Sequence, residues 1–108
     1  MKRGDIVLVA PPGDYGKPRP AVVIQSNRMR ATDSVLLVPM MSALEDAPIY
    51  RLQIEPASGN SLKRASQIMI EKIVAMPKHK VGQVIGRLSP EELVALNSML
   101  AAVIGLAD

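Results

Sequence analysis

Cysteine, tryptophan and phenylalanine are absent from this sequence, and it contains only one histidine. Without cysteine the chain has neither disulfides nor thiolate chemistry, and a cytoplasmic location is the simplest expectation. One histidine and no cysteine are too few ligands for a His/Cys zinc site, so we expect no metal and no other cofactor. A histidine-pair acid–base mechanism is excluded, and a Ser-His-Asp triad would depend on His79 in "PKHK", a segment typical of an exposed basic turn.

Aromatic side chains are equally scarce, because Tyr15 and Tyr50 are the only two. The chain therefore lacks the stacking platform of many proteins that bind single-stranded nucleic acid. No apolar run is long enough to cross a bilayer, and "MKRGD" leads directly into a predicted strand without the pattern of a signal peptide. We therefore expect no membrane association, and any binding of nucleic acid would depend on arginines, backbone groups and polar side chains.

The 108 residues are enough for one domain, spanning residues 1–108, with 48% hydrophobic residues and a net charge of +3. The positive charges are clustered. Four lie between Tyr15 and Thr32 without an acid, and five between Lys63 and Lys80 accompany only Glu71. Such runs are usually solvated loops, so the charge alone permits an anionic partner without requiring one.

Short β-branched runs bounded by glycine and proline predict a mainly β protein. The segment 49–55 alternates, which predicts Tyr50, Leu52 and Ile54 on one face and Arg51, Gln53 and Glu55 on a solvated face. The segment 66–76 reads as one long strand with a bend near Glu71 and Lys72. "KVGQVIGRL" then reads as a linker that could hold one turn of tight helix. The predicted strands are 5–10, 21–26, 34–40 (ended by Pro39), 49–55 and 66–76.

The last segment predicts an amphipathic helix over about 89–105. Ser89 is a candidate N-cap, Pro90 suits the first helical position, and Glu92 completes a capping box. Leu88 and Leu93 are spaced for a hydrophobic staple, and Gly105 is placed for a left-handed C-terminal cap. Several short strands followed by one helix favour a small SH3-like barrel, or a strongly bent antiparallel sheet, covered by the helix.

The stretch "GDYGKPRPAVVIQS" (13–26) holds Arg19 between two prolines. Proline fixes its own backbone angle and keeps the preceding residue extended, so Lys17 and Arg19 have little conformational freedom. A pre-set arginine suits a phosphate ligand, although the same pattern simply starts a strand. If the predicted strands share one sheet, Ser42 after the third strand and Gln67 at the start of the long strand could converge with Arg19 and Asp14. Singly, each also has an ordinary structural role in turns or ladders.

Five segments occur in the order and spacing found in the MazF/PemK toxins: "RGDIVLV", "GKPRPAVVIQS", "LLVPMMS", "SQIMIEKI" and "IGRLSPEEL". The chain resembles this family of bacterial toxin–antitoxin toxins over essentially its whole length. The resemblance implies a dimeric barrel that cuts single-stranded RNA at short sequences without a metal. It also implies a cognate antitoxin whose C-terminal segment lies across the active groove.

The resemblance also implies site residues. The essential arginine of the family falls on Arg19 and its acidic residue on Asp14, a candidate general base. The family usually has threonine at the position of Met41 and serine at Ser42, so Ser42 is the candidate hydroxyl of this chain. Gln67 matches a recurrent glutamine, and Arg64 matches an arginine of some relatives. Ser66 stands where those relatives have an acid. The expected RNA-binding residues are Lys17, Tyr15, Arg64, Ser66 and Gln67.

Two other functions stay open from the sequence. Gyrase-poisoning toxins of the CcdB type share the fold and resemble this chain around "VPMMSAL", but they act through a Trp-Gly-Ile tail, whereas this chain ends Gly-Leu-Ala-Asp. A non-catalytic SH3-like module that binds RNA is the second alternative. The predicted RNA-cleaving chemistry needs one preorganised cation above all, and Arg19 is the residue best suited to supply it.

Overall fold

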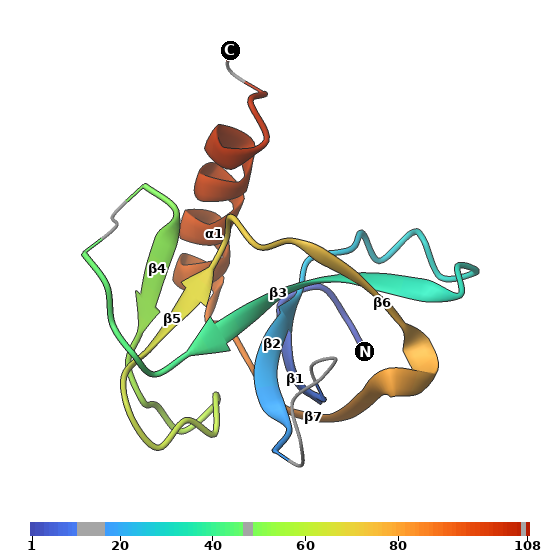
Figure 1. The fold of residues 1–108 in the computed structure, drawn as a ribbon, viewed down its shortest axis with the longest axis horizontal. Coiled ribbons are helices and arrows are strands. Elements are labelled where there is room, and N and C mark those ends of the chain that lie inside the picture. Colours follow the sequence, from blue (N-terminus) through green and yellow to red (C-terminus); the bar gives the residue numbers. More distant parts are fainter. Residues whose placement is uncertain (11–16, 47–48, 107) are drawn as a thin grey trace.

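The computed structural model describes residues 1–10, 17–46, 49–106 and 108, which form seven strands, a short 3-10 helix and a C-terminal α-helix (Figure 1). The strands are antiparallel to their neighbours and connect in the order β4-β5-β3-β2-β1-β7, with β6 also paired to β3. The predicted combination of a bent antiparallel sheet and one helix is therefore confirmed. The elements are β1 (Asp5–Val9), β2 (Arg19–Val23), β3 (Ser34–Met41), β4 (Arg51–Ile54), β5 (Ser66–Met69), β6 (Val74–Pro77), η1 (Lys78–Lys80), β7 (Val81–Arg87) and α1 (Pro90–Val103).

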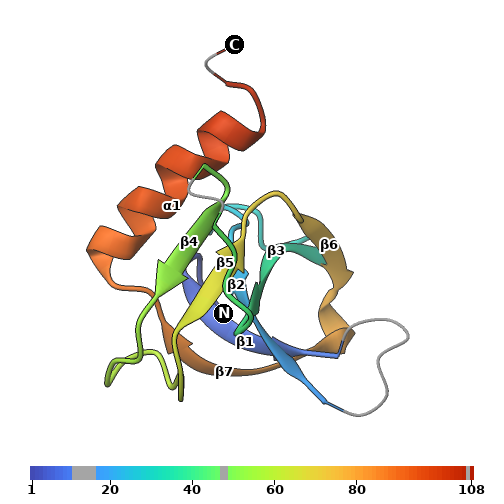
Figure 2. The ribbon, with the colours of Figure 1, turned by 60° about the vertical axis from the view of Figure 1, so that its left-hand side comes forward.

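Strand β3 joins two parts of the sheet. Its first half pairs with β6 on one edge, from Ser34 to Leu37, whereas its last two residues pair with β5 on that same edge. Figure 2 shows β1, β2, β3, β6 and β7 curling around a common centre, with η1 linking β6 to β7. The β4–β5 pair extends away from this curl and lies beside α1. The curled sheet and the β4–β5 ladder thus separate at the end of β3, at Met40 and Met41.

Alternation along the strands separates two hydrophobic clusters. In β2, Val22 belongs to a cluster that includes Ile68 and Leu96 of α1, whereas Ala21 and Val23 belong to a second cluster inside the curl. Burying both faces of the sheet requires nearly continuous apolar strands, which explains the runs "DIVLV" and "AVV". Met99 and Val103 pack against the first cluster and Leu100 is buried in it, so this part of the apolar face of α1 belongs to the core.

Local signals define the helix as the sequence predicts. The Ser89 hydroxyl accepts a hydrogen bond from the backbone N–H of Glu92, and the Glu92 carboxylate accepts one from the N–H of Ser89. At the other end Gly105 has a φ of +78°, and the N–H groups of Gly105 and Leu106 donate to the carbonyls of Ala102 and Ala101. This is a Schellman ending, which a residue with a side chain would enter only with strain.

Three strand boundaries differ from the prediction. Pro39 lies inside β3, opposite Ala21 of β2, and does not end the strand. The segment 66–76 forms two strands instead of one, because the chain turns after Met69, where the N–H of Lys72 donates to the Met69 carbonyl. Strand β2 begins at Arg19 and ends at Val23, earlier at both ends than the predicted 21–26.

The predicted linker "KVGQVIGRL" is also wrong, since most of it is strand β7, which pairs with β1. The tight helical turn precedes it, at Lys78–Lys80. Gly86 makes this pairing compatible with the neighbouring loop: a Cβ there would lie 2.6 Å from the carbonyl oxygen of Gly59 and 2.7 Å from the Cα of Asn60. Glycine at position 86 is therefore required by close backbone packing.

Candidate active site

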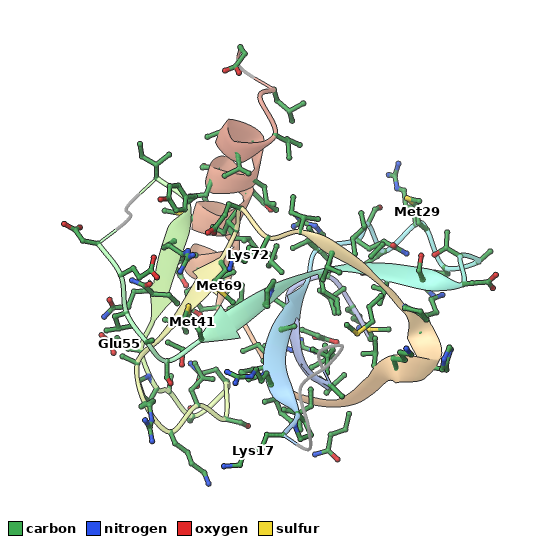
Figure 3. All side chains as sticks on the ribbon, in the orientation of Figure 1. Lys17, Met29, Met41, Glu55, Met69 and Lys72 are labelled. Atoms are coloured by element: carbon green, nitrogen blue, oxygen red, sulfur yellow. The ribbon has the colours of Figure 1, made fainter. Side chains whose placement is uncertain are left out.

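Arg19 is the first residue of β2 and its side chain is exposed. It is paired with Val9 of β1, whereas the pairing of β2 with β3 ends at Ala21 and Pro39. Because alternate residues of a strand share a face, Arg19 projects from the same face of the sheet as Ala21. Lys17, two residues earlier, is also exposed, and Figure 3 shows it at the start of β2. The extended backbone that the two prolines predict at Arg19 is confirmed.

The last residues of β3, which pair with β5, carry the next candidate residues. Met41 is two residues beyond Pro39, so it projects from the face that also carries Arg19, and it is paired with Gln67 of β5. Figure 3 shows Met41 and Met69 where the end of β3 meets β5. Ser42 follows immediately and is exposed. Ser42 and Gln67 therefore lie close together at the end of β3, whereas their predicted convergence with Arg19 stays a prediction.

Gln67 is buried, and its side-chain amide makes two hydrogen bonds to the backbone of one residue. Its Nε2 donates to the Glu45 carbonyl at 2.7 Å, and its Oε1 accepts from the Glu45 N–H at 2.9 Å. With one donated and one accepted hydrogen bond, the Gln67 side-chain amide pairs with the backbone of Glu45 as a residue of a neighbouring strand would. Gln67 therefore fixes the segment that contains Ser42.

Ser66 and Arg64 lie apart from this arrangement. Ser66 is buried, is paired with Ile54, and donates its hydroxyl to the Arg64 carbonyl. Its position alternates with Gln67, so it belongs to the face of β5 that carries Ile68 and packs toward α1. Its predicted RNA contact therefore gains no support from this geometry. Arg64 is exposed in the loop before β5, accessible to a ligand.

The sequence did not indicate Arg51 as a site residue, and its predicted exposure is wrong. Arg51 is only 8% exposed and donates to both carboxylate oxygens of Glu71. Hydrogen bonds from Arg51 hold the pKa of the Glu71 carboxyl below its usual value, against the opposing effect of burial. The partner is 20 residues away, so alternation within the strand gave no signal of it.

Two predicted site residues, Asp14 and Tyr15, lie outside the described residues. Within residues 1–10, 17–46, 49–106 and 108, no three His, Cys, Asp or Glu side chains gather closely enough to hold a metal ion. In the same part of the chain no helix has the length and apolar character needed to span a membrane.

Comparisons with known proteins show which family the chain belongs to. Residues 2–104 match the family model described as PemK-like, MazF-like toxin of type II toxin–antitoxin system. The chain is 39% identical over 108 residues to a probable endoribonuclease MazF of Mycolicibacterium smegmatis, covering 99% of each protein.

Solved structures resemble the fold at lower identity. An endoribonuclease in complex with its cognate antitoxin, from a mycobacterial species, has a TM-score of 0.80 at 22% identity and covers 98% of this chain and 96% of that one. MazF from Deinococcus radiodurans has a TM-score of 0.77 at 16% identity, covering 97% and 96%. MazE–MazF complexes from the same organism also match the fold. With a family model that spans nearly all of the sequence and a full-length relative, the chain belongs to the PemK-like, MazF-like toxins of type II toxin–antitoxin systems.

Proposed function

We propose that this toxin is an endoribonuclease that cuts single-stranded RNA at specific short sequences without a metal ion. The full-length 39% identity to a probable endoribonuclease is the observation that carries this proposal. Arg19 at the start of β2 and Ser42 after β3 are both exposed, and in this proposal they act together on the RNA. Lys17 and Arg64 add exposed positive charge that attracts a polyanion.

In this chemistry the ribose 2′-hydroxyl attacks the adjacent phosphate, the bond to the 5′-oxygen breaks, and the products carry a cyclic phosphate and a 5′-hydroxyl. Negative charge grows on the phosphate as the 2′-oxygen approaches. The planar guanidinium of Arg19 can donate to two of the phosphate oxygens at once. The neighbouring prolines restrict the backbone at this position, which lowers the entropy lost when the arginine is ordered around the phosphate.

The proton transfers need two further groups. A base must take the proton from the 2′-hydroxyl, and an acid must protonate the leaving oxygen. Asp14 is the proposed base on the strength of the family pattern. Ser42 is the proposed partner of a phosphate oxygen, because the pKa of a hydroxyl is too high for efficient proton exchange near neutral pH.

We also propose that the toxin is a cytoplasmic, single-domain homodimer neutralised by a cognate antitoxin, whose C-terminal segment covers the groove at Arg19. An apolar groove of about 540 Å³ beside the end of α1 supports a contact between two copies. Its lining includes the exposed Leu36, Ile104 and Leu106. Burial of such side chains in a dimer would stabilise it by roughly 25 cal/mol per Å² of apolar surface removed from water.

The test is incubation of the purified protein with a long single-stranded transcript in EDTA, followed by sequencing of the cut ends. Cleavage at a recurring short sequence with 5′-hydroxyl products supports the proposal. Intact RNA combined with inhibition of gyrase would instead indicate a CcdB-like toxin. Binding of RNA without cleavage or gyrase inhibition would indicate a non-catalytic module.

A further inference from the structure

Arg51 is a buried arginine that lies next to the candidate site. Arg51 projects from the face of β4 that carries Gln53, opposite Met69 of β5. Its Nε donates to the two carboxylate oxygens of Glu71 at 3.0 and 3.1 Å, and its Nη2 donates to Glu71 Oε2 at 2.5 Å. A guanidinium fixed by several charge-assisted bonds to one carboxylate has little rotational freedom.

The same guanidinium also reaches the segment that contains Ser42. Nη1 lies 3.4 Å from the sulfur of Met41 and 3.6 Å from Oε2 of Glu45. Met41 and Glu45 flank the residues 42–44, so one side chain contacts both ends of this short segment. The Tyr50 ring covers the guanidinium from another side, with its centroid 5.9 Å from the Arg51 Cζ.

Gln67 holds the same two ends through different atoms. Its backbone is paired with Met41, and its side-chain amide makes both hydrogen bonds to the backbone of Glu45. Ser42 is thus exposed on a segment whose first and last residues are each held twice. Such support is the usual means of keeping a reactive hydroxyl within a fraction of an ångström of its working position.

We propose that Arg51 is a positioning residue for cleavage: through Met41 and Glu45, and together with Gln67, it fixes Ser42 against the phosphate held by Arg19. The inference rests on the proposed function. Arg51 acts on the reaction without touching RNA, because its charge is directed at Glu71 and Glu45 and its side chain is buried. A displacement of about 1 Å in a reacting constellation costs on the order of 10²-fold in rate.

The test compares Arg51→Met with Arg51→Lys and with a matched control, Arg28→Met, which removes an exposed arginine from the turn after β2. Cleavage is measured by kcat and KM, and hydrogen exchange by NMR reports protection of the Glu45 amide. For Arg51→Met we expect kcat to fall by about 10²-fold with KM within about twofold, together with faster exchange at Glu45. Arg51→Lys should recover part of kcat, whereas Arg28→Met should leave both measurements unchanged.

Removal of Arg51 alone takes away a buried side chain and also leaves the partly exposed Glu71 carboxylate without its partner, so a change in kcat could reflect the charge of Glu71. The double variant Arg51→Met with Glu71→Gln removes this unpaired charge and is measured in the same way. Unchanged kcat, or a rise in KM with kcat retained, would overturn the positioning role, and so would unchanged protection of Glu45. If the wild-type protein cleaves no RNA, the proposed function fails, while the exchange at Glu45 still decides whether Arg51 holds the segment.

Discussion

Two arginines of this chain show how the surroundings of a guanidinium determine its role. Arg19 is exposed at the start of β2, between prolines that keep its backbone extended. Arg51 is buried between two glutamates and a tyrosine ring, so its charge is used within the protein. The exposed guanidinium of Arg19 suits the binding of a ligand, whereas the buried guanidinium of Arg51 suits the positioning of neighbouring residues. Sequence patterns predict Arg19 as a site residue because its signal is local, and they missed the burial of Arg51 because its partners come from distant segments.

Met41 occupies the position where the family usually has a threonine, on the face of the sheet that carries Arg19. Met41→Thr would restore a hydroxyl there but would also remove the sulfur that Arg51 contacts, so the comparison is with Met41→Val, and we expect kcat for RNA cleavage to be about tenfold higher in Met41→Thr than in Met41→Val. Met41→Val is the matched control, because valine has the shape of threonine without the hydroxyl. Equal rates for the two variants would show that a hydroxyl at this position does not contribute.

Glu71 makes the stability of the protein depend on pH. Its pKa is lowered in the folded state by hydrogen bonds from Arg51, so in acid the unfolded state binds more protons than the folded state. The resulting stabilisation is complete above the usual glutamate pKa of about 4.3 and is lost as the pH falls through the lowered value. Urea denaturation between about pH 7 and pH 3 should show a shallower loss of unfolding free energy in Glu71→Gln than in wild type.

Asp33→Asn is the control for this measurement, because Asp33 is an exposed carboxylate remote from the Arg51 network. It should follow the wild-type pH profile. A Glu71→Gln profile that parallels that of the wild type would contradict the coupling between Glu71 and Arg51.

At the scale of elements, the helix was predictable because the signals at its ends lie within a few residues of each other. Ser89, Glu92 and Gly105 have the roles that their spacing predicts. The strand β7 was not predictable in this way, because it is defined by pairing with β1 at the opposite end of the chain. The split of 66–76 has the same cause: β5 and β6 pair with different parts of β3, and the chain must turn between them.

Gly86 allows β7 to pass close to the loop at Gly59 and Asn60, and this close approach can be tested. In Gly86→Ala the new methyl group would lie within 2.6 to 2.8 Å of three backbone atoms, so the loop or β7 must shift. We expect a loss of about 1–3 kcal/mol in the free energy of unfolding, measured by urea denaturation. Gly59→Ala is the matched control, because nothing lies within 4 Å of a Cβ at that position. Equal effects of the two substitutions would contradict this packing.

At the scale of the whole molecule, the sheet buries both of its faces in the curl and against α1, yet an apolar surface stays exposed near the end of the helix. Ile104 is 55% exposed and Leu106 is 74% exposed. The amphipathic pattern of the helix could not predict this division, since periodicity cannot tell which apolar partner covers a face. The structure places Leu100 in the core, packs Val103 against it and leaves Ile104 and Leu106 exposed.

If two copies associate through the groove beside α1, a charge placed there must weaken the dimer. Ile104→Glu should convert the dimer to a monomer in light scattering coupled to size-exclusion chromatography, because an unpaired carboxylate at an apolar interface is strongly unfavourable. Val94→Glu is the control: Val94 is 65% exposed on the same helix but does not line the groove. A dimer that persists in Ile104→Glu would exclude this surface as the contact.

The central claim is that the Arg19 guanidinium stabilises the charge that develops on the phosphate during cleavage. The most direct measurement compares the rate at which wild type, Arg19→Ala and Arg28→Ala cleave a defined transcript in EDTA, with melting temperatures confirming that each variant is folded. We predict that Arg19→Ala loses at least about 10²–10³-fold in rate while Arg28→Ala retains the wild-type rate. A folded Arg19→Ala protein that cleaves RNA as fast as wild type would contradict the claim.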